Sequence, residues 1–181
     1  MAKFFSTLNP EITEFIQQQL VFFAATAPEN GRLNLSPKGM DTFRIVDSTT
    51  VAYLDLTGSG NETAAHLAEN GRITFMFCSF SAKPLILRLY GMGEVVRPNN
   101  PKWPTLKPLF PELPGTRQII VATIDSLQTS CGFAVPMFES QQERALLTDW
   151  AQKKGPDGIE LYWREKNLSS IDGHPTHLLD E

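Results

Sequence analysis

Apolar residues recur along this chain in two periods, one typical of helices and one typical of strands. Near the N-terminus, Ile12, Phe15 and Ile16 follow the helical period. The residues before them, NPE at 9–11, provide a capping side chain, a proline at the first helical position and an acid in the first turn. The pattern therefore predicts a helix over about residues 9–19.

The next part of the chain, up to about residue 137, is dominated by short apolar runs and period-two alternation, which are typical of strands. Turn residues separate the runs, and PENG at 28–31 predicts a hairpin between the first two. Gly91 and Gly93 predict a bend or bulge inside a long strand. The predicted strands cover residues 20–26, 32–36, 51–56, 73–80, 85–96 and 117–125. Residues 41–46 are predicted to be short and semi-extended, and a further extended stretch covers 127–137.

A short helix is predicted in the middle of this series, between the strands at 51–56 and 73–80. Ser59 and Glu62 have the spacing of a capping box, and Asn70-Gly71 provides a left-handed stop. A helix N-terminus after a glycine turn collects N–H groups that point one way, which suits a phosphate. The same residues would also serve a connection that binds no ligand, so both interpretations stay open.

The C-terminal quarter of the chain predicts a helical region over about residues 140–167. Ser140 and Glu143 repeat the capping-box spacing, and KKGP at 153–156 predicts a break between two helices. The polar tail from residue 169 onward is expected to fray unless it docks on the rest of the protein. A proline-rich stretch before the last strands, residues 99–115, predicts a short helix or two turns.

These elements favour one mainly β domain over residues 1–181. The chain has 181 residues, of which 41% are hydrophobic, enough for one full core. About six strands are joined mostly by short turns, and only one short helical crossover is predicted. A doubly wound parallel sheet is therefore disfavoured, and a small, mostly antiparallel barrel with flanking helices fits better.

Charge and hydropathy exclude some partners. Twenty acidic and sixteen basic residues give a formal net charge of -4, and no basic stripe suggests nucleic acid. No stretch approaches 18 apolar residues, and the first apolar run is short for a signal peptide, so a cytoplasmic protein without a membrane partner is expected. Cys78 and Cys131 lie far apart in apolar contexts and are expected to be buried free thiols.

The sequence contains no nucleophile elbow, no complete dinucleotide-binding fingerprint and no Walker motif. His174 and His177 are three residues apart in the tail, but nothing nearby supplies a firm ligand set, so no metal site is expected. If the protein is an enzyme, a cofactor is expected to carry the reactive atoms, and no catalytic acid or base can be named.

Polar residues on two predicted strands have two interpretations each. Asn34, Ser36 and Lys38 share one side of their strand, which either faces solvent at a hairpin edge or presents donors to a phosphate or carbonyl. Arg88 lies among apolar residues, and it is either exposed on the sheet or paired with an anionic ligand.

Three segments together are similar to the pyridoxamine 5′-phosphate oxidase-like family of FMN-binding split barrels. They are LNLSPKGMDTFRI, VAYLDLTGSGNETAAHLAENGRITFMF and LRLYGMGEV. In that family a short helix ends in L-x-x-N-P/G-R-V/I and a later strand carries R-x-x-G, and here residues 67–73 and 88–91 occupy those places. The similarity, strongest over residues 24–96, implies a six-stranded, mostly antiparallel split β-barrel and a homodimer that holds FMN at its interface.

The resemblance also implies which residues bind the cofactor. By position these are Asn34, Ser36, Lys38, Leu56, Thr57, Asn61, Glu62, Thr63 and Arg88. Family members that act on pyridoxamine phosphate usually have Ser-Arg-Lys where this chain has Asn-Glu-Thr at 61–63, so two cations are missing. Pyridoxamine phosphate is therefore not the expected substrate, and Glu62 is interpreted as a capping residue. Lys38, Arg88 and helix N–H groups are expected to hold the phosphate.

The function that follows from the resemblance is that of an FMN-dependent oxidoreductase acting on an unknown small molecule. The alternatives are a flavin- or haem-binding module that senses or stores without turnover, and a dimeric scaffold whose site has decayed.

Overall fold

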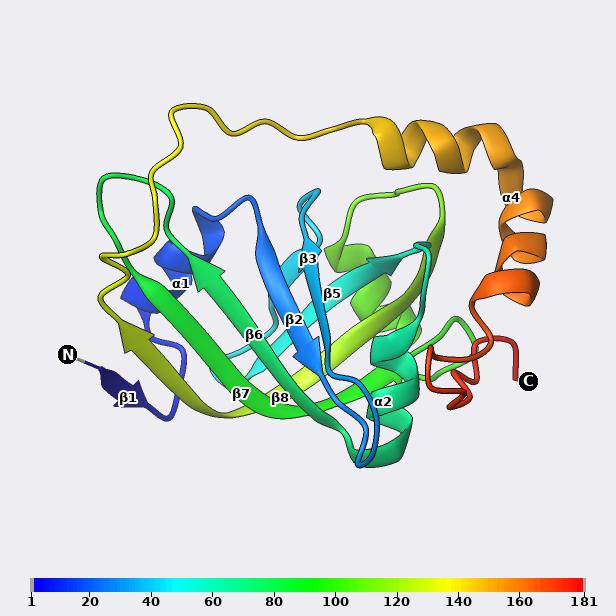
Figure 1. Cartoon of the computed structure of the whole chain (residues 1–181), viewed down its shortest axis with the longest axis horizontal. Helices are drawn as coiled ribbons and strands as arrows, with labels where there is room; N and C mark the ends of the chain where they lie inside the picture. Colours follow the sequence, from blue (N-terminus) through cyan, green and yellow to red (C-terminus); the bar gives the residue numbers. More distant parts are fainter. Residues whose placement is uncertain (1, 181) are drawn as a thin grey trace.

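The computed structural model describes residues 2–180 and consists of one twisted antiparallel sheet with helices around it (Figure 1). The strand order is β3-β2-β6-β7-β8-β5-β4, and β1 pairs with β8. The strands are β1 (Lys3–Phe5), β2 (Phe22–Thr26), β3 (Asn34–Lys38), β4 (Phe43–Ile45), β5 (Thr50–Leu56), β6 (Arg72–Cys78), β7 (Ile86–Val96) and β8 (Thr116–Ser130). The helices are α1 (Pro10–Gln17), α2 (Glu62–Asn70), α3 (Trp103–Leu106), the 3-10 turn η1 (Lys107–Leu109) and α4 (Leu146–Lys166).

The expected mostly antiparallel, mainly β fold is confirmed, with eight strands among residues 2–180 instead of six. The count rises because the three-residue strands β1 and β4 also pair. The predicted bulge is confirmed where the β7–β8 register shifts between Tyr90 and Gly91. Only glycine fits there, since a Cβ on Gly91 would lie 2.1 Å from the Thr123 carbonyl oxygen.

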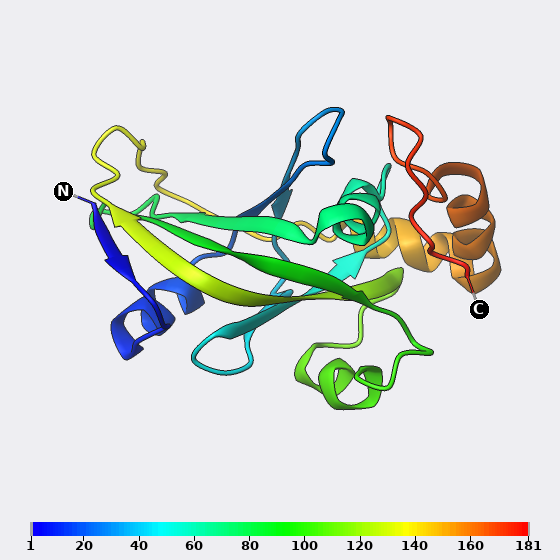
Figure 2. The same cartoon turned by 90° about the horizontal axis from the view of Figure 1, so that it is seen from below.

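Apolar side chains fill both faces of the sheet around β5, which explains its nearly unbroken apolar run. One face holds the aromatic cluster of Phe22, Tyr53, Phe75 and Phe77, whose ring centroids lie 5.6 to 6.2 Å apart in the pairs that involve Phe22. On the other face a second cluster packs beneath α3 and η1, on the side of the sheet opposite α2 (Figure 2). Strand β5 is thus held from both sides, which fixes the position of its polar C-terminal end.

The predicted start of α1 is confirmed, because Asn9 Oδ1 accepts a hydrogen bond of 2.9 Å from the Ile12 N–H. Both predicted capping boxes are wrong. The Glu62 carboxylate accepts from the Ile171 N–H, and the Glu143 carboxylate accepts from the Met40 N–H. Each carboxylate thus bonds a backbone donor far away in the sequence, and α4 begins only at Leu146.

The C-terminal region leaves the sheet as a long extended segment that crosses the molecule before α4 begins (Figure 1). Gly155, with φ 67° and ψ 172°, interrupts α4 just before Pro156. The break between two helices that was predicted at residues 153–156 is therefore confirmed. The expectation of two buried cysteines is wrong for Cys131, which is exposed beyond the end of β8, whereas Cys78 is buried. Within residues 2–180, no helix has the length and hydropathy needed to cross a membrane.

Candidate functional site

A cavity of about 630 Å³ opens between β3, the turn before α2 and the chain after α4. Its volume falls in the range of roughly 300–1,000 Å³ that is usual for small-molecule sites. It is lined by Arg32, Leu33, Asn34, Ser36, Lys38, Asp55, Leu56, Gly58, Ser59, Gly60, Asn61, Glu62, Thr63, Arg117, Lys166, Ser169, Ser170 and Ile171.

Strand β3 presents its polar side to this cavity. Asn34, Ser36 and Lys38 are partly buried and line it, whereas Leu35 between them is 55% exposed on the opposite side. This arrangement is the reverse of a hairpin edge with polar residues in solvent. The polar side of β3 therefore faces a cavity and not open solvent.

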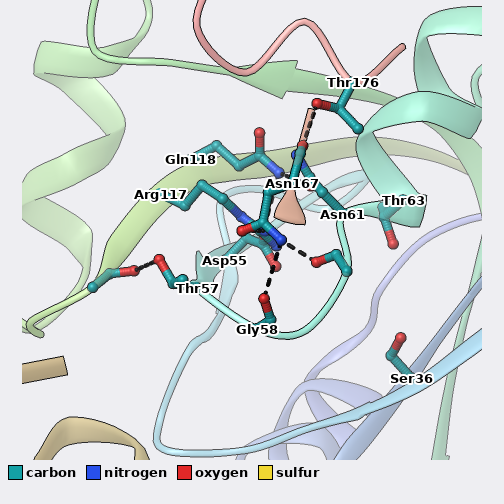
Figure 3. Close-up of polar contacts among 12 residues, drawn as sticks. Ser36, Asp55, Thr57, Gly58, Asn61, Thr63, Arg117, Gln118, Asn167 and Thr176 are labelled. Atoms are coloured by element: carbon teal, nitrogen blue, oxygen red, sulfur yellow. Dashed lines mark hydrogen bonds and ion pairs between the residues drawn. The ribbon is translucent and has the colours of Figure 1, made fainter. Parts of the chain in front are cut away.

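The donors of β3 meet those of α2 in the cavity. Asn34 Nδ2 lies 3.4 Å from Thr63 Oγ1, and Ser36 Oγ donates to Asn34 Oδ1 at 3.2 Å. The hydroxyls of Ser36 and Thr63 point toward the same space (Figure 3). Two elements that are distant in sequence therefore present hydroxyl and amide groups to one volume.

The N-terminus of α2 faces the cavity without a side-chain cap. Asn61 precedes the helix, but its side chain makes no capping hydrogen bond. Its Oδ1 instead accepts from Gln118 Nε2 at 2.8 Å, while its buried Nδ2 has no hydrogen-bond partner within residues 2–180. A buried amide donor without a partner is costly, and a ligand oxygen at this point would satisfy it.

Behind the cavity lies a buried ionic network centred on Asp55. Arg117 donates to Asp55 Oδ2 through Nε at 3.0 Å and Nη2 at 2.8 Å, and Gln118 Nε2 donates to the same oxygen at 2.8 Å. Lys38 Nζ lies 3.3 Å from Oδ1. Burial alone raises the pKa of Asp55, but the charges of Arg117 and Lys38 more than offset this effect and hold it below its usual value.

Helix α4 is attached to the same turn from outside. Asn167, which is fully buried, donates to the Gly58 carbonyl at 3.2 Å and accepts from Arg117 Nη1 at 3.0 Å (Figure 3). Trp163 Nε1 donates to Thr57 Oγ1 at 2.7 Å. The glycine turn that forms one cavity wall is therefore held by hydrogen bonds on the side facing away from the cavity.

Seven of the nine residues expected to bind the cofactor line this cavity, and Thr57 and Arg88 do not. The Thr57 hydroxyl donates to the Gly115 carbonyl at 2.8 Å and accepts from Trp163, so its bonding capacity is used behind the turn. Arg88 lies on β7 opposite Met76 and Gln128, and its guanidinium lies 3.4 Å from Ser130 Oγ. It contacts neither the cavity nor Lys38.

Sequence reasoning missed the network behind the cavity. The network could have been suspected from Asp55, because a carboxylate inside an apolar strand needs a cationic partner. Arg117 and Gln118, polar residues at the start of another apolar strand, were candidates for that partner. No local pattern identified Asn167, because its partners lie about 50 and 109 residues away. Among residues 2–180, no group of three or more His, Cys, Asp or Glu could hold a metal ion.

Comparison with known proteins defines the class of this protein. Residues 8–131 match the family model described as pyridoxamine 5'-phosphate oxidase, so the chain belongs to that family. A relative from Aspergillus flavus, pyridoxamine 5'-phosphate oxidase family protein ustO, is 41% identical over 144 residues. The aligned region covers 77% of this chain and 58% of the relative, so this chain spans little more than half of that protein's length.

Solved structures with similar folds confirm the split-barrel architecture. HupZ of Group A Streptococcus superposes with a TM-score of 0.55 at 20% identity, over 66% of this chain and 91% of that one. A Clostridium acetobutylicum protein of the pyridoxinephosphate oxidase family, related to general stress protein 26, gives a TM-score of 0.53 at 16% identity, over 67% and 86%. At these identities the similarity concerns the fold alone.

Proposed function

We propose that this protein binds FMN in the cavity between β3 and α2, with the phosphate at the N-terminus of α2. The observation that carries the proposal is the convergence of Asn34, Ser36 and Lys38 with Asn61 and Thr63 on one volume. Hydroxyl, amide and ammonium donors beside an uncapped helix N-terminus form an environment suited to a phosphate dianion.

The charge of the lining fits the same group. Four cationic side chains face two carboxylates: Arg32, Lys38, Arg117 and Lys166 against Asp55 and Glu62. Asp55 is hydrogen-bonded to Arg117 on one oxygen, with Lys38 beside the other. Arg32 is also paired with Asp172, so with that carboxylate counted the lining keeps an excess of one cation toward an anion. The unpartnered Asn61 Nδ2 adds a donor that the protein itself leaves unused.

The proposed activity is that of an FMN-dependent oxidoreductase acting on a small molecule. Bound FMN would supply the hydride or electron transfer. The residues described above would bind and orient it: β3 and α2 at the phosphate end, and the Asp55 network as the support that keeps both elements in place.

A homodimer is part of the proposal, as the family resemblance implies, and a cytoplasmic location is proposed with it. Edge strand β3 supports it, because Leu35 is 55% exposed on its outer side. Phe133 and Phe138 are also exposed, at 81% and 55%, on the segment that leads to α4. Exposed apolar side chains of this size are typical of surfaces that pack against another subunit. Light scattering on the purified protein tests this part, and a monomer at all concentrations would contradict it.

The binding proposal is tested by the visible spectrum of the purified protein, followed by fluorescence titration with FMN. We expect flavin absorbance or saturable binding of added FMN, weakened at least about tenfold in Lys38→Met, since a charged hydrogen bond contributes roughly 1.5–3 kcal/mol. Lys102→Met is the matched control, because Lys102 pairs with Glu94 on the surface away from the cavity. A colourless protein that does not bind FMN would overturn the proposal. If FMN binds but neither NADH nor NADPH bleaches it, a non-catalytic binding module is favoured.

A further inference from the structure

The chain beyond α4 folds back as a hairpin over the cavity. Ser169 and Pro175 form a β-bridge, and the segment lies beside α2 in both views (Figures 1 and 2). We refer to residues 168–176 as the C-terminal hairpin. The family match ends at residue 131, so the hairpin lies outside the matched region.

The base of the C-terminal hairpin is buried and firmly bonded. Thr176 and Asn167 are both fully buried, and Thr176 Oγ1 donates to the Asn167 carbonyl at 2.6 Å. Arg97 Nη2 donates to the Thr176 carbonyl at 2.6 Å. Since Asn167 also holds the Gly58 carbonyl, the base of the hairpin and the cavity turn are parts of one structure.

The tip of the hairpin closes onto two cavity walls. The Ile171 N–H donates to both carboxylate oxygens of Glu62, at 3.1 and 3.0 Å. Asp172 accepts from the Arg32 N–H at 2.7 Å and forms an ion pair with the Arg32 guanidinium. Gly31 makes this approach possible, because a Cβ there would lie 2.7 Å from Asp172 Oδ2. The tip is therefore fastened to the first residue of α2 and to the loop before β3.

The hairpin lines the cavity beside the N-terminus of α2, where the proposed function places the phosphate. Ser169, Ser170 and Ile171 of the hairpin line the cavity, and Ile171 bonds the residue that begins α2. A flavin mononucleotide ends at its phosphate. A flavin dinucleotide continues from that phosphate into a second phosphate and an adenosine, which need an open path beyond the helix N-terminus.

We infer that the C-terminal hairpin makes the site selective for FMN over FAD by occupying the space into which the adenylate half would extend. The inference rests on the proposed function and adds to it the element that limits ligand length. Selectivity here is steric, arising from an obstacle to the longer ligand, whereas Lys38, Ser36 and Thr63 provide the attraction that both flavins share.

The test compares the dissociation constants of FMN and FAD for three proteins by fluorescence titration. They are the wild type, a variant lacking residues 171–173, and Asp172→Asn, which keeps the chain intact but weakens the tip contact. Asp157→Asn is the matched control, since it removes the same charge from an exposed position on α4. Circular dichroism verifies that each variant is folded.

We expect the wild type and Asp157→Asn to bind FMN at least about tenfold more tightly than FAD, a difference that one steric obstacle readily produces. The deletion should bring this ratio close to one by improving FAD binding, and Asp172→Asn should lower it less. Comparing the ratio of the two dissociation constants cancels the effect of a change in the protein's net charge, because FMN and FAD are both anionic. An unchanged ratio in both hairpin variants, or equal wild-type affinities, would overturn this inference and leave FMN binding intact. Binding of neither flavin by the wild type would overturn both proposals.

Discussion

The cavity has two walls that are built differently. The inner wall is formed by β3, the edge strand of the sheet, and by the turn before α2. It is supported by Asp55 and Arg117, whose side chains are 2% and 3% exposed. The outer wall is the C-terminal hairpin, whose tip is held by Glu62 and by an ion pair in which Arg32 is 68% exposed.

Buried, fully partnered charges are costly to disturb, whereas an exposed ion pair contributes little and is screened by salt. We therefore expect the inner wall to be rigid, a fixed template whose charges and hydrogen-bond donors determine which chemical groups can bind. The outer wall is held by weaker contacts, and we expect it to determine how long a bound ligand can be. The predictions below test this division, beginning with the largest effect.

Removing the central cation of the inner wall should have the largest effect. Arg117→Met leaves the buried Asp55 without its main partner and should lower the free energy of unfolding by about 3–5 kcal/mol. Urea denaturation measures this loss. Arg164→Met, which breaks an exposed pair with Glu160, should cost less than about 1 kcal/mol. Equal costs for the two variants would show that the inner wall is not a fixed template.

The second largest effect is expected at Asn167, which links the two walls. Asn167→Ala removes the bonds to the Gly58 carbonyl and to Arg117 and should cost about 1–3 kcal/mol of stability, because it leaves buried polar groups without partners. Thermal unfolding compares it with Asn99→Ala, an exposed position that should change little. If the two variants unfold alike, Asn167 does not join the walls.

A smaller and purely local effect is expected at Ser36. Its hydroxyl lies in the cavity and supports no buried charge, so Ser36→Ala should leave stability unchanged. FMN affinity should fall about threefold to tenfold, the effect of one hydrogen bond worth roughly 0.5–1.5 kcal/mol. Ser140→Ala, on an exposed segment, is the control. A loss of stability without a change in affinity would contradict the role given to Ser36.

The smallest effect concerns the hairpin tip at acid pH. The Arg32 backbone N–H, and then the Arg32 guanidinium, hold the pKa of Asp172 below its usual 3.8. A lowered pKa means that the tip contact is fully present above pH about 4 and is lost as the pH falls through the folded-state pKa. The NMR shift of the Arg32 amide should report this transition. Asp172→Asn should abolish it, and a transition that persists in this variant would rule out the assignment.

Much of the fold was predictable because it is determined by local pattern. The helix start at Asn9, the hairpin before β3 and the bulge at Gly91 depend on residues within a few positions of each other, and all three are confirmed. The capping boxes at Glu62 and Glu143 failed for the opposite reason. Each carboxylate bonds a backbone donor more than 100 residues away, and no local pattern contains that partner.

The candidate site shows the same division. The polar positions of β3 were identified from their alternation, and the structure gives them a shared cavity with Asn61 and Thr63. The C-terminal hairpin was predicted only as a tail that frays unless it docks. Its docking depends on Asp172 meeting Arg32, a pair separated by 140 residues. Contacts of this kind become visible only when the chain is folded.

The central claim is that donors of β3 and α2 converge on one phosphate, and it is tested most directly by comparing FMN with riboflavin. Riboflavin has the same ring system and ribityl chain but no phosphate. We predict that the protein binds FMN at least about a hundredfold more tightly, since several charge-assisted hydrogen bonds together contribute roughly 3 kcal/mol or more. Equal affinities for the two ligands in a fluorescence titration would contradict the claim.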